Sequence, residues 1–366
     1  MKTLVSSAFA VALCLLLIQS TKIPLREINY PDHSVKSPSG SSDLFGNDEI
    51  LHLKLSGNIR SLFNDRSDDA VYHPLVLSYK SADSSEININ IKAKTRGNFR
   101  RKRENCIMPP ILLNFSKKES VGTVFSDQDK LKLVTPCRSN NYVIREYLVY
   151  KLYNLLTPKS FRAKLTFITF YDTEKKKEIT FYGILLEEDE QMAERNGSNI
   201  FKNIKIQGES TETTTFLKMA MFQYMIGNTD WSVPYLHNIR LVALDSISVP
   251  AAVPYDFDHA GIVDAPYALP PEQLEMTSTH ERRFRGYCIT DMKSLDEVVT
   301  TYNGLKSDIY KVYNSCTLIE AKYKKTTLKF LDDFFVIIND AKKLKSEFTY
   351  PCKANSTNFV IKGLKN

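Results

Sequence analysis

Apolar and polar residues alternate along the chain from Glu49 onward, and this pattern restricts the fold more than any other feature of the sequence. Leu51, Leu53 and Leu55 are separated by polar residues, which is the spacing of a strand with one buried face. Similar alternation predicts four more strands, at Val71–Tyr79, Ile87–Lys94, Ile111–Phe115 and Leu131–Val134. We therefore expect the first third of the chain to form a mainly antiparallel sheet.

Helical patterns become more frequent further along the chain. Tyr142–Leu156 predicts a helix with one buried face that ends before Pro158. Phe216–Ile226 is apolar on nearly every side, which indicates a buried helix. The other predicted elements are strands at Leu165–Tyr171, Ile179–Leu186, Ile239–Leu244 and Val249–Tyr255 and helices at Leu295–Tyr313 and Leu318–Leu344. This order predicts an α+β protein in which a β-rich part, residues 48–190, precedes a helix-rich part, residues 191–366.

The N-terminus has the features of a secretory signal peptide. Lys2 precedes the mostly apolar run Leu4–Ile18, and polar residues follow it. The run is shorter than the roughly 20 residues that a membrane-spanning helix needs. We expect a signal peptide at residues 1–20, a Pro- and Ser-containing flexible linker at residues 21–47, and an exported mature protein without a transmembrane segment. The periplasm, the cell surface and the medium remain open as destinations.

Much of the positive charge of the chain is concentrated in one segment. The net charge is +7, and Lys94–Glu104 holds six basic residues and one acid. Such clustering favours an anionic ligand at one place, and with Phe99 as the only aromatic residue it does not predict a nucleic-acid partner. We assign a phosphate-binding role to Arg96 alone, whereas a solvated hairpin tip is the other interpretation. A second basic cluster either recruits an acidic acceptor or pairs with upstream acids; it contains Arg282, Arg283 and Arg285.

Five cysteines remain after the signal peptide is removed. They are Cys106, Cys137, Cys288, Cys316 and Cys352. An exported protein can form disulfides, but the odd number leaves one thiol over and the sequence does not choose the pairing. Neither Cys-x-x-Cys nor His-x-x-x-His spacing occurs, so a structural zinc site is not expected.

Two polar segments on either side of the hairpin predicted at residues 239–255 carry the strongest signal for chemistry. The first follows the buried helix and contains Asp230 and Asn238, and the second contains Asp256 and Asp258. This order of parts is used for phosphoryl transfer, and carboxylate and amide oxygens suit Mg²⁺ or Mn²⁺. We assign Asp230 as the base and Asn238, Asp256 and Asp258 as metal ligands. The alternative is that these residues only cap the helix end and the turns.

Short motifs in the same order resemble those of the CotH-type (spore-coat) atypical kinases. Lys94-Thr-Arg-Gly-Asn98, with the following strand up to Phe115, is similar to the Arg-Gly-Asn motif of that family. Further similar motifs are Ile144-Arg-Glu146, Tyr182–Glu188, Asn228-Thr-Asp230 and Asp256-Phe-Asp258. The resemblance spans roughly residues 50–290. The motif after the hairpin also looks like that of HipA-type kinases, and the chain is similar to exported proteins of Bacteroidetes type that have no established activity.

The resemblance implies a protein-kinase-like two-lobed fold, with a β-rich N-lobe and a helix-rich C-lobe, that binds ATP with Mg or Mn. It implies that Lys132, Glu146, Arg96 and Glu187 bind the nucleotide. Lys132 would pair with Glu146, although Lys94 and Lys130 are also eligible. Glu187, with Glu188, would lie beside the adenine, and a solvent-facing acidic turn is the other interpretation of this pair. Two departures from the family pattern favour a protein that binds without catalysis: residues 106–110 lack the expected lysine, and the loop from Asp230 to Asn238 is longer.

Three functions remain open at this point. The first is an exported kinase-like protein that binds a nucleotide and a divalent metal and, if active, transfers a phosphoryl or nucleotidyl group to an unknown protein or envelope glycan. The second is a catalytically silent kinase-fold scaffold of the cell envelope. The third is a metal-dependent hydrolase that uses Asp230, Asp256, Asp258 and His259 around one or two ions. The scarcity of ATP outside the cytoplasm lowers the expectation of catalysis, and the sequence does not decide whether the chain is an enzyme.

Overall fold

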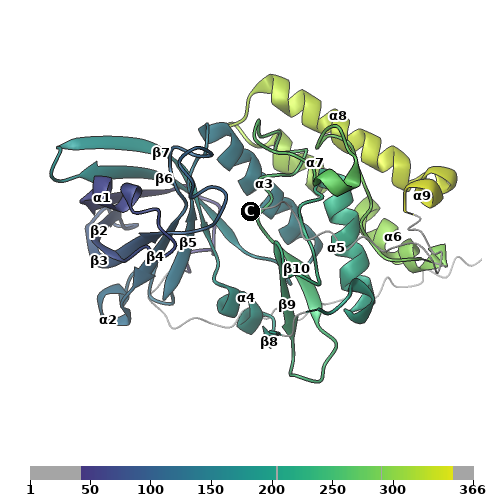
Figure 1. Ribbon diagram of the computed structural model, residues 1–366, viewed down its shortest axis with the longest axis horizontal. Helices are drawn as coiled ribbons and strands as arrows, with labels where there is room; N and C mark the ends of the chain where they lie inside the picture. The colour runs from purple at the N-terminus through teal and green to yellow at the C-terminus, as the bar shows by residue number, and fades with distance from the viewer. Residues whose placement is uncertain (1–42, 203–204, 290, 349–366) are drawn as a thin grey trace, which may run out of the picture. The chain divides into compact units, whose positions relative to one another are not determined.

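The computed structural model describes residues 43–202, 205–289 and 291–348, all within one compact unit, Gly40–Asn366 (Figure 1). The predicted signal peptide at residues 1–20 and most of the predicted linker lie outside the described residues. Among the residues described, no helix combines the length and the apolar character needed to span a bilayer.

Seven strands form a closed barrel. In spatial order they are β1 (Leu51–Gly57), β2 (His73–Lys80), β3 (Glu86–Thr95), β4 (Ile111–Phe115), β5 (Lys130–Val134), β7 (Lys177–Leu186) and β6 (Ala163–Asp172). Neighbouring strands are antiparallel except β1 and β6, which pair in parallel with Leu51 opposite Thr166. Alternate residues fill the barrel interior, as Leu53, Leu55 and Leu77 show. The strands predicted from the alternating pattern are therefore confirmed.

The closed barrel contradicts the predicted fold class. The expected two-lobed protein-kinase-like fold, with a β-rich N-lobe and a helix-rich C-lobe, is wrong because all seven strands of the β-rich part close on themselves. Closure depends on β1 pairing with β6, two segments that lie far apart in the sequence. Alternation reports that a strand has one buried face, but it carries no information about whether the sheet closes.

Helices and a small second sheet follow the barrel strands (Figure 1). Helix α3 (Asn140–Leu156) and helix α5 (Thr213–Ile226) bury most of their residues and share one hydrophobic core. The second sheet has the order β10 (Ala251–Pro254), β9 (Ile239–Ala243) and β8 (Asn199–Ile200). The other helices are α1 (Ile59–Asn64), α2 (Lys117–Ser120), α4 (Asp189–Arg195), α6 (Asp296–Gly304), α7 (Lys306–Asn314), α8 (Ala321–Ile338) and α9 (Ala341–Glu347).

Each of the two long helices predicted near the C-terminus is in fact two helices. The first divides into α6 and α7 at Leu305, and the second into α8 and α9 at Asn339 and Asp340. The Asp340 carboxylate accepts hydrogen bonds from the backbone N–H groups of Lys342 and Lys343, so it caps α9 as a separate helix. Amphipathic periodicity continues across such a break and does not reveal it.

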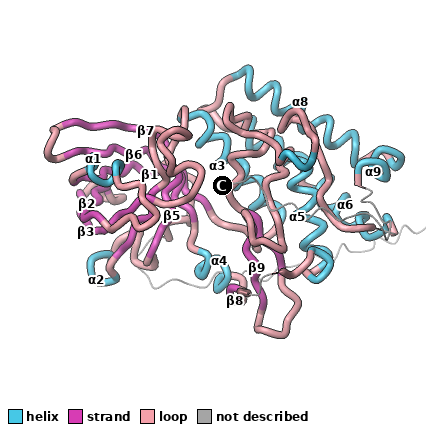
Figure 2. The backbone as a smooth tube through the Cα atoms, in the orientation of Figure 1, coloured by secondary structure: helices cyan, strands magenta, loops and turns pink. Residues whose placement is uncertain are grey.

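The connection between β3 and β4, residues 96–110, contains no helix or strand (Figure 2). A disulfide between Cys106 and Cys137 ties it to the segment between β5 and α3. Cys288 is also disulfide-bonded, and Cys316 is a free thiol. The expectation of disulfides is therefore confirmed, and the first of them fixes a loop that carries part of the site described below.

Candidate functional site

A cleft of ≈ 400 Å³ brings together residues from the β3–β4 connection, the barrel, the loop after α5 and the segment after β10. This volume lies in the usual range for small-molecule sites. Seven of the residues predicted from the sequence line the cleft: Arg96, Lys132, Asp230, Asn238, Asp256, Asp258 and, from the hydrolase alternative, His259. Glu146 and Glu187 do not line it.

The loop after α5 holds Asp230 in a network of hydrogen bonds. Gly227 ends the helix in the left-handed region, with φ at 68°, and Asn228 accepts a hydrogen bond from the Asp230 N–H at 3.0 Å. The Asp230 carboxylate lies 2.8 Å from His237 Nε2 and accepts a bond from Asn238 Nδ2 at 3.1 Å. Burial lowers the pKa of His237, but the hydrogen bond and charge of Asp230 outweigh it and raise the pKa. Asp230 is therefore a buried carboxylate fixed in position.

Asp256 is held by its backbone while its side chain stays unpaired. Its φ is 59°, and its N–H donates to the Tyr150 hydroxyl at 2.9 Å. Within the described part of the chain, its carboxylate forms no hydrogen bond or ion pair, although the residue is half-buried. Burial, followed by the charge of Asp258, raises the pKa of Asp256 to about 6, and Arg100 and Arg96 partly oppose this. A cation bound beside Asp256 and Asp258 would offset the repulsion between their two carboxylates.

Arg100 lies between two further carboxylates. Its Nη1 is 3.7 Å from Glu146 Oε2 and 3.6 Å from Asp258 Oδ2, and all three side chains are buried. Burial raises the pKa of Glu146 well above its usual value, and Asp258 raises it further, whereas Arg100 opposes both. The predicted pairing of Lys132 with Glu146 is wrong, because Arg100 takes that place from a loop that the sequence pattern marked only as basic.

Lys132 forms a different ion pair. Its ammonium group donates to the carboxylate of Asp189 on α4, which also accepts from Arg240 Nε at 2.5 Å. Burial, the largest influence, lowers the pKa of Lys132, while Asp189 opposes the shift. Lys132 therefore reaches the cleft as predicted but is already neutralised by a neighbour from the acidic run at residues 187–190.

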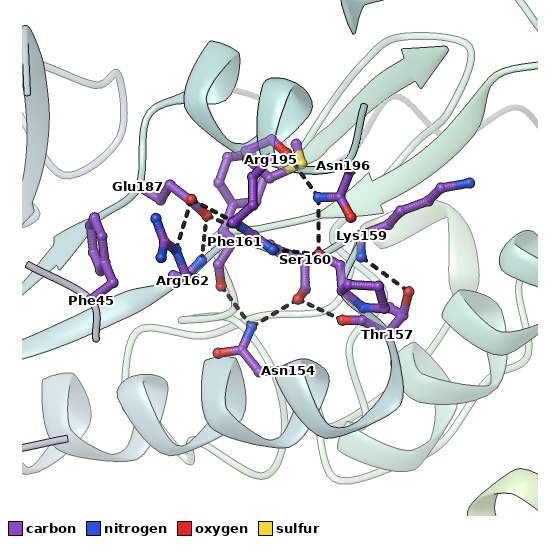
Figure 3. Close-up of polar contacts among 12 residues, drawn as sticks. Phe45, Asn154, Thr157, Lys159, Ser160, Phe161, Arg162, Glu187, Arg195 and Asn196 are labelled. Atoms are coloured by element: carbon purple, nitrogen blue, oxygen red, sulfur yellow. Dashed lines mark hydrogen bonds and ion pairs between the residues drawn. The ribbon is translucent and has the colours of Figure 1, made fainter. Parts of the chain in front are cut away.

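Glu187 lies in a separate network beside the start of β6 (Figure 3). Its side chain is completely buried and accepts hydrogen bonds from Arg162 Nε at 2.9 Å and from Arg195 Nη2 at 2.9 Å. Arg195 also donates to the backbone oxygens of Pro158 and Ser160. Glu187 thus joins the end of β7 to β6 and α4, and the structure does not bring it to the cleft.

Most cations of the basic run at residues 94–103 are used inside the protein. Arg101 pairs with Asp68, Arg103 donates to Asn64, and Lys94 lies over the ring of Tyr72. Lys102 is exposed. Arg96 is half-buried in the cleft wall, and its guanidinium has no hydrogen-bond or ion-pair partner among residues 43–202, 205–289 and 291–348. Arg96 is therefore the cation of the run that lines the cleft without a partner among the described residues, while Lys102 and Arg103 lie exposed at the surface.

The second basic cluster supports the loop that carries Asp230. Arg285 donates to the backbone oxygens of Thr229 and Trp231, the two neighbours of Asp230. Arg282 donates to the backbone oxygen of Met225, and Arg283 is exposed. This support of the loop could not be predicted from the sequence, because backbone carbonyls leave no signal in a residue pattern.

The cleft offers a partial set of oxygen donors for a divalent cation. Among the described residues, no group of three or more His, Cys, Asp or Glu side chains is arranged to hold a metal ion. Asn238, Asp256 and Asp258 form a partial set of two carboxylates and an amide, which suits a cation such as Mg²⁺ that keeps water and phosphate ligands. His259 packs between the rings of Phe99 and Tyr267 instead.

Comparisons with known proteins give no independent indication of function. No model of a known protein family matches the chain, and a search of the curated proteins finds no significant match. The resemblance to CotH-type kinases therefore stays a prediction, and function is inferred from the cleft.

Proposed function

We propose that the cleft binds a nucleoside triphosphate with Mg²⁺ or Mn²⁺ and transfers a phosphoryl group to a protein or glycan acceptor outside the cytoplasm. One observation carries this proposal: two oppositely charged side chains without partners among the described residues, Arg96 and Asp256, line the same cleft. Arg96 also lowers the pKa of Asp256, so the two groups are close enough to interact. A ligand with both a cation and phosphates would satisfy both.

The residues that line the cleft divide the binding of this ligand between them. Asp256, Asp258 and Asn238 supply the oxygen atoms that would hold the cation. Arg96 presents a planar guanidinium, which pairs well with phosphate oxygens. When bound, the divalent cation would neutralise charge on the phosphate oxygens.

Asp230 is the group that would accept the proton of the acceptor hydroxyl. Its carboxylate is oriented by His237 and Asn238, and its backbone is held on both sides by Arg285. A base fixed in this way needs little reorganisation when the proton moves.

Lys132 gives a reason to keep a second candidate, a protein that binds the nucleotide without transferring phosphate. Its ammonium already pairs with Asp189, and a phosphate would have to compete for it. The hydrolase alternative has less support: His259 lines the cleft, but among the described residues its ring contacts are with Phe99 and Tyr267 and it forms no ion pair with a carboxylate of the cleft.

The buried Cys106–Cys137 disulfide supports the proposed export. Disulfides persist in oxidising surroundings such as the periplasm or the medium and are rare in the cytosol.

The first experiment measures the melting temperature of the mature protein, residues 21–366, with ATP and Mn²⁺, each alone and together. Ligand at a hundred times its Kd adds about 2.7 kcal/mol to the free energy of unfolding, so we expect a clear rise for the wild type and none for Asp256→Ala. Transfer from γ-labelled ATP is measured in parallel, and Asp230→Asn should keep the thermal shift while losing about 10²-fold or more in transfer. A shift without transfer in the wild type favours the silent protein, and no shift overturns the proposal.

A further inference from the structure

Arg100 is shared between two carboxylates and bound tightly to neither. Its Nη1 atom lies at nearly equal distances from Glu146 Oε2, 3.7 Å, and Asp258 Oδ2, 3.6 Å. Both distances exceed those of a hydrogen bond. The guanidinium is anchored on its other side by a hydrogen bond from Nη2 to the backbone oxygen of Thr135. A small movement of Nη1 would therefore favour one carboxylate over the other.

Two atoms of this cluster are buried without hydrogen-bond partners. Arg100 Nε and Glu146 Oε1 are both inaccessible and unpaired, and the two residues are 9% and 1% exposed. Buried polar atoms are nearly always paired, so each exception calls for an explanation such as an ion or an alternative arrangement. Here the unpaired atoms are one donor and one acceptor, and they belong to residues that already face each other.

We infer that a divalent cation bound at Asp256 and Asp258 releases Arg100 from Asp258 and lets it close on Glu146. This inference rests on the cation site of the proposed function. The cation would take over the negative charge of Asp258, and Arg100 would then form direct hydrogen bonds to Glu146, as arginine–carboxylate pairs commonly do. Glu146 on α3 is thus a positioning residue: it does not hold the cation but removes the competitor for Asp258.

In this arrangement, the affinity of the cleft for a cation depends on whether the Glu146 side chain is long enough to contact Arg100. If the Glu146 side chain cannot bind the Arg100 guanidinium, the guanidinium stays with Asp258. The cation must then displace the guanidinium from Asp258. If Glu146 acted through its charge alone, the length of its side chain would matter little, because a charge acts over several ångströms and does not require contact. Shortening the side chain while keeping its charge separates the two explanations.

The test is the affinity of the mature protein for Mn²⁺ alone, measured by isothermal titration calorimetry. We expect Glu146→Gln and Glu146→Asp each to weaken Mn²⁺ binding about tenfold, equal to about 1.4 kcal/mol. The matched control is Glu212→Gln, which removes a half-buried carboxylate ion-paired with Lys159, 2.9 Å away and outside the cleft. It should bind Mn²⁺ as the wild type does. Melting curves without Mn²⁺ verify that every variant is folded.

A double variant, Arg100→Met with Glu146→Gln, should recover wild-type affinity because nothing then competes for Asp258. Wild-type Mn²⁺ affinity in Glu146→Asp would overturn the inference, because the charge of the side chain would then be enough without its full length. Wild-type affinity in Glu146→Gln, or no recovery of affinity in the double variant, would overturn it as well. These results leave the proposed function in place. Absence of Mn²⁺ binding to the folded wild type would overturn both.

Discussion

Two groups of buried carboxylates in this protein are bonded in opposite ways. Glu187 is enclosed by Arg162 and Arg195, and both of its oxygens accept hydrogen bonds from them (Figure 3). In the cleft, the Asp256 carboxylate has no partner among the described residues, and Glu146, which does not line the cleft but faces Arg100, keeps one oxygen unpaired. Burial alone therefore does not identify a functional acid. A saturated network stabilises the fold, whereas an unsaturated one is what a ligand can complete.

The largest expected effect comes from breaking the saturated network. Glu187→Ala leaves two half-buried arginines without their shared carboxylate, and we expect a loss of about 3 kcal/mol in the free energy of unfolding, the lower end of the cost of breaking a buried ion pair. Urea unfolding measures it. The thermal shift with ATP and Mn²⁺ should persist, because Glu187 lies outside the cleft. A loss below about 1 kcal/mol would show that the network is not the structural element described here.

The opposite sign is expected for Asp256→Asn without ligand. Since the pKa of Asp256 is raised to about 6, its charged form is disfavoured in the folded state. The penalty is absent below the unfolded pKa of 3.8, where both folded and unfolded chains are protonated, grows as the pH rises from there to about 6, and is full above it. The variant should therefore be more stable by about 1–3 kcal/mol at pH 7.5, with the gain vanishing towards pH 4. Thermal unfolding at both values checks this, and a destabilised variant at pH 7.5 would contradict it.

A smaller effect, on binding rather than stability, is expected at Arg96. Arg96→Gln should weaken ATP binding in the presence of Mn²⁺ about tenfold, or about 1.4 kcal/mol, and leave binding of Mn²⁺ alone unchanged. Lys102→Gln is the control from the same basic run, because its side chain is exposed. Equal losses in the two variants would mean that the run attracts ATP only through its total charge.

The smallest expected change concerns the backbone of Asp256. Tyr150→Phe removes the hydroxyl that accepts the Asp256 N–H and should cost about 1 kcal/mol in stability. Because Asp256 has a positive φ that this bond helps to hold, Mn²⁺ affinity should also fall. Calorimetry compares the two proteins, and an unchanged affinity would show that the backbone of Asp256 is fixed by other contacts.

Local patterns predicted the strands and the buried helices well, because alternation and helical periodicity report directly on burial. They also predicted that Asp230, Asn238, Asp256 and Asp258 meet in one cleft, since the order of the two loops around a hairpin restricts where they can lie. The closure of the barrel could not be read in this way. It depends on pairing between β1 and β6, which no local segment encodes.

Side-chain partners were the least predictable part of the site. Lys132 was expected to pair with Glu146, but Asp189 lies nearer to it in the folded chain and Arg100 reaches Glu146 from another loop. Several cations compete for each acid in a basic chain, and small differences in loop position decide the pairing. The disulfide at Cys106 is one such constraint, because it fixes the connection that carries Arg100.

We propose that the carboxylates of Asp256 and Asp258 hold a divalent cation. An anomalous difference map from crystals of the mature protein grown with Mn²⁺ and ATP tests this. We expect one Mn²⁺ peak within coordination distance of Asp256 and Asp258, phosphate density beside Arg96, and Arg100 hydrogen-bonded to Glu146. A cleft without Mn²⁺ density in crystals grown at saturating Mn²⁺ would contradict it.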